Sequence, residues 1–209
     1  MSDRVKSYFL LADQYLETSK LLLETLIQNN NSNCGLGSTE YEAHENMIKN
    51  VLKSDSTLLT PAIFNSYQCM ELFLKGILLL NKIEIDDTHE VTEMIEKIKM
   101  LYGEKSNIYK KVKAFYKEQM EIIKTFKKTN NITSTKELYE SLRYPENNSI
   151  NLDKRKKYNY YDLKYNGDYG IDNFKLLLKR LNEVKKVILL EYHTKMWKVV
   201  KELISNAKI

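Results

Sequence analysis

The sequence contains very little proline and glycine. It has two prolines and six glycines in 209 residues, far below usual shares of about 5% and 7%. Turns between strands depend heavily on these two residue types, so their scarcity argues against a β-sheet protein. Leucine, lysine, glutamate and isoleucine dominate instead, a composition that favours helices. We therefore expect an all-α fold: one domain over residues 1–209, with appended segments.

Long apolar runs and cysteine clusters are also missing. No stretch approaches the ~18 apolar residues of a membrane span, and the start, MSDRVKSYFLLADQYLE, does not resemble a signal peptide. Cys34 and Cys69 are the two cysteines, without the spacing of a metal site, which fits a reducing cytosol. We expect a soluble, cytoplasmic protein without a membrane partner.

The usual catalytic signatures are absent as well. The chain contains no GxGxxG, P-loop, HExxH, CxxC or GxSxG motif, each of which marks a known chemistry. Its histidines, His44, His89 and His193, lie in different segments. The sequence therefore predicts no metal site and no cofactor.

Apolar spacing divides the first half of the chain into helices. Residues 5–28 repeat apolar positions every three or four residues, as one face of a helix does. Residues 29–58 form an insertion, consisting of an Asn, Gly and Ser loop and a short peripheral helix over 39–53 with capping-box spacing. From Pro61, suited to a first turn, to Asn81, apolar residues on several faces predict the central helix.

The second half continues the helical pattern. Asp87 is the predicted cap of a helix that Gly103 ends, and another helix is expected over 105–128. A capping box at Ser134 precedes a short helix that closes at Pro145. A polar, tyrosine-rich loop spans 146–170, and a long terminal helix covers 171–209, whose far end is expected to pack on something else.

Positive charge is concentrated in two places. Residues 97–128 hold ten lysines against three glutamates, and a basic run stands just before Tyr158. Basic side chains among aromatic ones suit a phosphate backbone with unstacked bases; the alternative is a solvated lysine face whose aromatics enter the core. The candidate contacts are Lys110, Lys117, Lys154, Arg155, Lys156 and Lys157.

Three stretches resemble the HEPN superfamily (higher eukaryotes and prokaryotes nucleotide-binding). YQCMELFLKGIL at 67–78, THEVTEMIEKI at 88–98 and LRYPE at 142–146 are similar to the family's second helix, its histidine loop and the Arg-Tyr-Pro turn of one branch. They also occur in the family's order. The resemblance implies an up-and-down four-helix-type bundle, here with additional helices and a long C-terminal helix.

The same resemblance implies a metal-independent ribonuclease in many members, with an arginine followed after four to six residues by a histidine and paired across a dimer. No histidine stands at those positions after Arg4, Arg143, Arg155 or Arg180. The family's cleavage mechanism therefore does not transfer to this chain.

Four further residues are candidates for binding. Arg143 either binds phosphate in fork geometry or anchors its turn to an acidic residue, and Tyr144 shares both alternatives. Glu71 and Lys75, four residues apart on one helix, form either an ordinary exposed ion pair or a ligand contact. If Arg143 lies close to Glu71 in the folded chain, then Arg143, Glu71 and Lys75 form one charged cluster.

We expect a HEPN-like protein, a homodimer, that binds RNA, a nucleotide or a partner protein such as an antitoxin. The implied setting is bacterial defence or a toxin–antitoxin pair. One alternative is a divergent endoribonuclease that uses Arg143 with His89 or His193. The other is a purely structural interaction module whose long helix recruits a protein.

Overall fold

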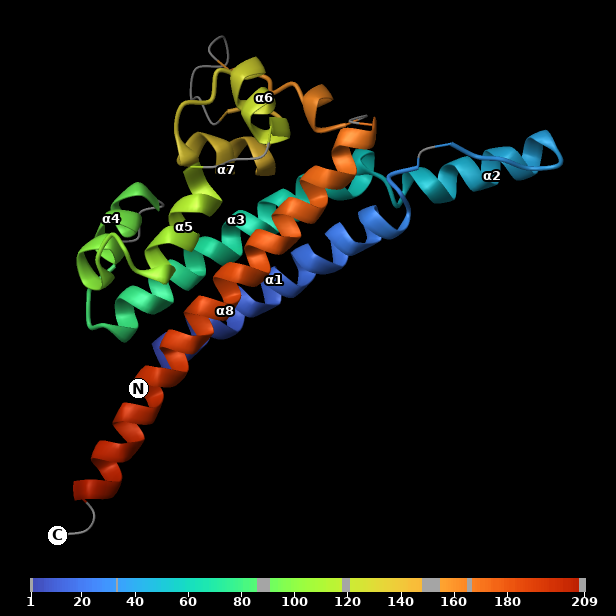
Figure 1. Ribbon diagram of the computed structural model, residues 1–209. Coiled ribbons are helices and arrows are strands. Elements are labelled where there is room, and N and C mark those ends of the chain that lie inside the picture. The colour runs from blue at the N-terminus through green and yellow to red at the C-terminus, as the bar shows by residue number, and fades with distance from the viewer. Residues whose placement is uncertain are drawn as a thin grey trace. The chain divides into compact units, whose positions relative to one another are not determined.

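The computed structural model describes residues 2–32, 34–85, 91–117, 121–147, 155–164 and 167–206, without the side chains of 167–169, 199, 200 and 202–206. In these ranges the chain is α-helical and has no strand, so the all-α class is confirmed (Figure 1). The elements are α1 (Asp3–Gln28), α2 (Glu40–Val51), α3 (Asp55–Leu80), α4 (Val91–Tyr102), α5 (Asn107–Lys117), α6 (Glu121–Thr129), α7 (Thr135–Arg143), the 3₁₀ helix η2 (Tyr161–Leu163) and α8 (Gly167–Asn206).

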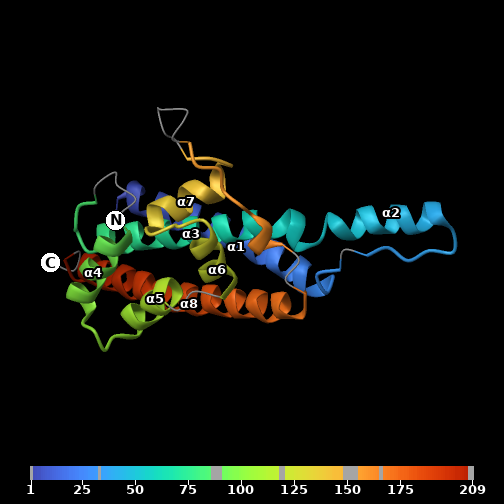
Figure 2. The ribbon, with the colours of Figure 1, turned by 90° about the horizontal axis from the view of Figure 1, so that it is seen from above.

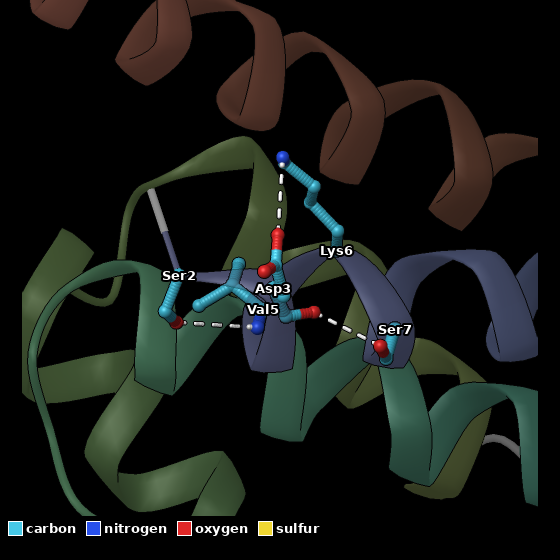
Figure 3. A network of polar contacts seen from close by, with 5 residues as sticks. All are labelled: Ser2, Asp3, Val5, Lys6 and Ser7. Carbon is cyan, nitrogen blue, oxygen red and sulfur yellow. Dashed lines mark hydrogen bonds and ion pairs between the residues drawn. The ribbon is translucent and has the colours of Figure 1, made fainter.

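Short polar side chains begin α1. The hydroxyl of Ser2 accepts a hydrogen bond from the backbone N–H of Val5 at 3.4 Å, which satisfies a donor that lacks a partner within the helix. Asp3, in the first turn, pairs with Lys6 at 3.3 Å, and Ser7 donates to the carbonyl of Asp3 (Figure 3). The local sequence thus determines where this helix starts.

The start of α3 differs from the sequence expectation. The helix begins at Asp55, and Pro61 lies inside it rather than in its first turn. Asn31 accounts for the earlier start: its side-chain oxygen accepts from the backbone N–H of Asp55 at 2.7 Å, and its amide donates to the Asp55 carboxylate at 3.0 Å. A residue 24 positions away therefore caps the helix.

The chain divides into two units built from separate stretches. Unit 1 comprises Met1–Gln14, Cys69–Glu118 and Arg180–Ile209, and unit 2 comprises Tyr15–Gln68 and Gln119–Lys179. The helices α1, α3 and α8 each contribute residues to both units.

Aromatic packing joins both ends of the chain in unit 1. The ring of Phe9 on α1 lies 6.3 Å from Phe73 on α3 and 4.6 Å from Tyr192 on α8. A Cβ at Gly76 would approach the Phe9 ring to 3.1 Å, so the missing side chain lets α3 come close. Cys69 is buried in the same unit, and desolvation raises the pKa of its thiol, which leaves it a small apolar group.

Unit 2 combines a polar contact between long helices with an apolar core. The hydroxyl of Ser19 on α1 donates to the carbonyl of Ala62 on α3 at 2.9 Å. The hydroxyl oxygens of Ser19 and Ser66 lie 2.7 Å apart. Small side chains at this crossing let the helices approach closely. Buried apolar residues of α6, α7 and α8 complete the core, among them Phe126 and Phe174.

One other boundary differs from the expected one. In the range expected as one helix over 105–128 the structure describes α5 and α6, and residues 118–120 between them lie outside the described part, so the single helix stays a prediction. The last helix starts at Gly167 instead of 171, and the side chains of Val199 and Leu203 are outside the description. The capping box at Ser134 and the helix end at Gly103, whose φ is +82°, are confirmed.

None of the helices in the described residues is both long and apolar enough to cross a membrane.

Candidate functional site

The helix α7 is anchored to unit 2 by its cap and one buried face. Ser134 and Glu137 form the capping box, and Glu137 also accepts from the backbone N–H of Thr133 at 2.7 Å. On the opposite side, Tyr139 is buried, donates its hydroxyl hydrogen to the carbonyl of Tyr67 and meets that ring edge-on at 5.8 Å. The position of α7 is therefore fixed by the cap at its N-terminus and by the contact of Tyr139 with Tyr67.

The turn after α7 is supported by the segment 155–164. The hydroxyl of Tyr160 lies within hydrogen-bonding distance of the carbonyls of Ser141 and Tyr144. The backbone N–H of Tyr158 donates to the carbonyl of Pro145 at 2.9 Å, and Glu146 and Lys157 form an isolated antiparallel bridge. The last carbonyls of α7 thus gain partners, as helix ends require.

A pair of asparagines attaches this segment to α6. The amide of Asn130 donates to the carbonyl of Asn159 at 2.8 Å, and its oxygen accepts from the backbone N–H of Asn159 at 2.6 Å. Two hydrogen bonds between one side chain and the backbone N–H and C=O of one residue fix both distance and orientation. This part of the predicted loop is consequently held against unit 2.

Arg143 is the exposed cation of the turn. Its Nε donates to the carbonyl of Tyr139 at 3.3 Å, and its guanidinium carbon lies 5.8 Å from the ring centre of Tyr144, which is 44% exposed. Among the described residues no carboxylate pairs with Arg143. That observation does not support the alternative in which the arginine anchors the turn to an acid.

The basic run beside the turn is partly neutralised by acids of unit 2. Arg155 donates to Glu146 at 2.7 Å, and Lys156 lies 5.7 Å from the ring centre of Tyr158. The pKa of Glu137 is lowered chiefly by the hydrogen bond from Thr133 and in smaller part by the charge of Lys156. Lys157 is exposed, whereas Lys154 lies outside the described residues. The run is therefore less available to a phosphate than its sequence suggests.

Burial changes the acidity of the tyrosines that support the turn. Desolvation is the main cause that raises the pKa of both Tyr158 and Tyr160. Both hydroxyls therefore keep their protons near neutral pH, and that of Tyr160 donates a hydrogen bond to the turn. The exposed Tyr161 stands next to them in η2.

The other lysine candidates lie in unit 1. Lys110 and Lys117 are exposed on α5, and this helix turns Tyr109, Phe115 and Tyr116 inward as buried residues. Its aromatic residues are therefore part of the core, as in the alternative interpretation of a solvated lysine face.

Glu71 and Lys75 form an ion pair at 2.8 Å inside unit 1, with side chains only 1% and 10% exposed. The sequence alternative of an ordinary exposed pair is wrong, because the apolar residues around α3 enclose both groups. Burial of this degree favours a structural role, since a ligand contact needs access. Arg143 belongs to the other unit, so the predicted cluster with Glu71 stays a prediction.

The histidine candidates have different surroundings. His193 is exposed on α8 in unit 1, with its ring 5.5 Å from that of Tyr192. His44 is exposed on α2 in unit 2, and His89 lies outside the described residues. A proton carrier beside Arg143 therefore stays a prediction.

The exposed end of α8 carries two large apolar side chains. Leu190 is 68% and Trp197 60% exposed, and Lys201 lies 5.6 Å from the ring centre of Trp197. Scattered apolar residues are ordinary on a surface, but two that stand about two turns apart on one face of the helix end fit the predicted contact with a partner.

Sequence reasoning missed two groups that position the turn. Tyr160 and Asn130 act through carbonyls of residues 19 and 29 positions away. A tyrosine-rich loop following a helix was the available signal for Tyr160, but nothing local to Asn130 indicated its partner. In the described residues no three His, Cys, Asp or Glu side chains gather as a metal site would require.

Comparison with known proteins places the chain in one family. No curated protein and no solved structure gives a significant match. A family model described as HEPN domain matches residues 41–183, a range that includes α3, α7 and the Arg143 turn and covers more than half of the 209 residues. The chain therefore belongs to the HEPN domain family.

Proposed function

We propose that the protein binds single-stranded RNA at the Arg143 turn without cleaving it. The observation that carries the proposal is an exposed arginine beside a half-exposed tyrosine ring, with no carboxylate partner among the described residues. A guanidinium offers several donors in fork geometry to phosphate oxygens. A neighbouring aromatic ring offers a stacking surface for an unstacked base.

The rigidity of the turn supports binding. Tyr160 bonds to the carbonyls of Ser141 and Tyr144, and the Asn130 pair fixes the segment that carries Tyr160, so little ordering is needed when a ligand arrives. Exposed Tyr161 and Lys157 provide a second ring and a second cation on the segment 155–164. Together these residues suit a short stretch of backbone and one or two bases.

Absence of the family's arginine and histidine spacing supports a non-catalytic role. Burial raises the pKa of Tyr158 and Tyr160, so both hydroxyls keep their protons at neutral pH and neither is ready to accept another. Strand cleavage through the ribose 2′-hydroxyl requires a group that removes its proton. Membership in the HEPN family adds the proposed setting, bacterial defence or a toxin–antitoxin pair, and a homodimer as the working form.

The test is RNA binding by the purified full chain without metal, with a labelled, mixed-sequence single strand at two salt concentrations. Arg143→Ala should weaken binding about five- to tenfold and reduce its salt dependence. Arg4→Ala is the matched control, because it removes the same charge from an exposed site on α1. Equal effects of both changes would show that only net charge matters and would contradict the proposal.

Cleavage is measured in the same samples. Intact RNA with salt-sensitive binding supports the non-catalytic role. Product that disappears in Arg143→Ala would establish the divergent nuclease instead, and His193→Ala would then identify whether that histidine participates.

Binding of a partner protein is the second candidate function, favoured by the exposed Leu190 and Trp197. Trp197 is the one tryptophan of the sequence, so its fluorescence reports contact at the end of α8 directly. We expect its emission to shift on addition of a cognate antitoxin, and Leu190→Asp to abolish the shift. An unchanged emission with a demonstrated partner would place that partner elsewhere.

A further inference from the structure

The insertion between α1 and α3 contains a ladder of hydrogen bonds. Residues 34–38, here called the strap, run alongside α2 (Figure 1 and Figure 2). Glu42 accepts from the backbone N–H of Ser38 at 2.9 Å, Asn46 donates to the carbonyl of Leu36 at 2.7 Å, and Asn50 donates to that of Cys34 at 2.6 Å. These α2 residues recur every four positions, so one face of the helix binds the strap.

Two glycines let the strap lie directly on the helix. A Cβ at Gly35 would be 2.0 Å from the carbonyl oxygen of Ala43, and one at Gly37 would be 2.4 Å from the Ala43 nitrogen. Such distances are impossible for any side chain, so the contact requires glycine. The strap and α2 therefore form one built element, the arm, over residues 34–53.

The arm exposes an apolar stripe away from the strap. Tyr41, Ile48 and Leu52 are 75%, 44% and 57% exposed, and their spacing of seven and four residues places them on one face. At 3.6 residues per turn that face is roughly 140° from the ladder face. α2 has no buried residue at all, so the stripe is an uncovered surface of a helix that the core does not hold.

Charge along α2 indicates what covers the stripe. Its first half carries Glu40, Glu42 and Glu45, whereas Lys49 stands in its second half and Lys53 follows just beyond its end. A second copy lying antiparallel would set each half against the opposite charge, whereas a parallel copy would set like charges together. Glu45 and Lys49 border the stripe on the same side, so in the antiparallel arrangement Glu45 faces Lys49 of the partner subunit.

We infer that the arm is a self-association surface on which α2 pairs antiparallel with α2 of a second copy. The contact is isologous, with Tyr41 against the partner's Leu52 and two symmetry-related pairs of Glu45 with the partner's Lys49. One helix pair of this length buries less than the ~1,200 Å² typical of stable complexes. The association step is therefore weak and depends on protein concentration. It does not depend on the RNA-binding proposal.

The first test measures the mass of the full chain by sedimentation over about a hundredfold range of concentration. Ile48→Glu should weaken one association step by about tenfold or more, because it places a charge in the centre of the stripe. Met100→Glu is the matched control, since Met100 is also exposed and lies on α4. Unchanged helix content in circular dichroism shows that each variant folds.

A second test uses the charges. Glu45→Lys alone and Lys49→Glu alone each place like charges together and should weaken the step about tenfold. An equal mixture of the two variants restores both attractive pairs, so association recovers in the mixture only. Mixing the two variants does not change the charge pairs inside either helix. Recovered association in the mixture therefore reports contacts between subunits and not an effect on the stability of α2 itself.

The inference is supported by loss in Ile48→Glu together with recovery in the mixture. A chain that stays monomeric at all concentrations, an association that Ile48→Glu leaves intact, or a mixture no stronger than its components would each overturn it. In those cases the stripe contacts a different protein or none.

Discussion

The neighbouring helices α2 and α3 are held in place by different forces. α3 is enclosed by apolar residues, and even its charged pair, Glu71 and Lys75, is buried. α2 buries no residue and is held by its cap and by the strap, through polar groups recurring at Glu42, Asn46 and Asn50. The position of α3 thus depends on buried apolar surface, and that of α2 depends on hydrogen bonds between polar groups.

Because of this difference, substitutions in the two helices should affect different measured properties. Apolar burial contributes to the free energy of unfolding of the whole chain, whereas an arm outside the core opens locally. Mutations in α3 should therefore alter global stability, and mutations in α2 should alter local protection and association.

The largest effect is expected from Lys75→Met. It leaves the Glu71 carboxylate buried without its neighbouring cation, a loss of about 3–5 kcal/mol in the free energy of unfolding. Urea unfolding measures it. The double change with Glu71→Met should recover most of the loss, and a double variant as unstable as the single one would show that the charges are needed for more than mutual pairing.

Tyr160→Phe should have the next largest effect. It removes the hydroxyl that serves the carbonyls of Ser141 and Tyr144, which should cost about 1–2 kcal/mol of stability in urea unfolding. Tyr41→Phe, the same change on the exposed face of α2, should be neutral. Equal effects at both sites would contradict the supporting role of Tyr160.

A smaller, pH-dependent effect is expected at Glu137. Its pKa is lowered in the folded protein, chiefly by the hydrogen bond from Thr133, so the carboxylate stabilises the fold fully above the usual glutamate pKa. That contribution is lost as pH falls through the lowered pKa. Glu137→Gln should cost about 0.5–1 kcal/mol at neutral pH, and the difference from wild type should vanish in acid. If the difference in the free energy of unfolding between Glu137→Gln and wild type does not change with pH, the charge of Glu137 is not its cause.

The smallest global effect is expected from Gly35→Ala. The added Cβ would collide with the Ala43 carbonyl, so the strap should leave α2 and its amides should exchange with solvent faster. The free energy of unfolding should change by less than about 0.5 kcal/mol, because no buried residue of α2 is involved. Leu36→Ala, an exposed strap position, is the control for exchange. Global destabilisation would show that the arm is coupled to the core.

Much of the fold was predictable because its signals are local. The capping box at Ser134, the end of α4 at Gly103 and the helical periodicity of α1 each depend on residues within a few positions. Arg143 and Tyr144 were candidates for the same reason, since an arginine and a tyrosine just before a proline stand on one turn, and their role in binding stays a prediction.

Residue composition and local patterns were enough to predict the helical class, most helix ends and the missing ribonuclease spacing. The start of α3 at Asp55, the burial of Glu71 and Lys75 and the support of the turn by Tyr160 depend on contacts between distant residues. Periodicity shows which residues share a face but not what covers that face. The partners that decide capping, desolvation and support come from distant positions, and only the folded chain brings them within hydrogen-bonding distance.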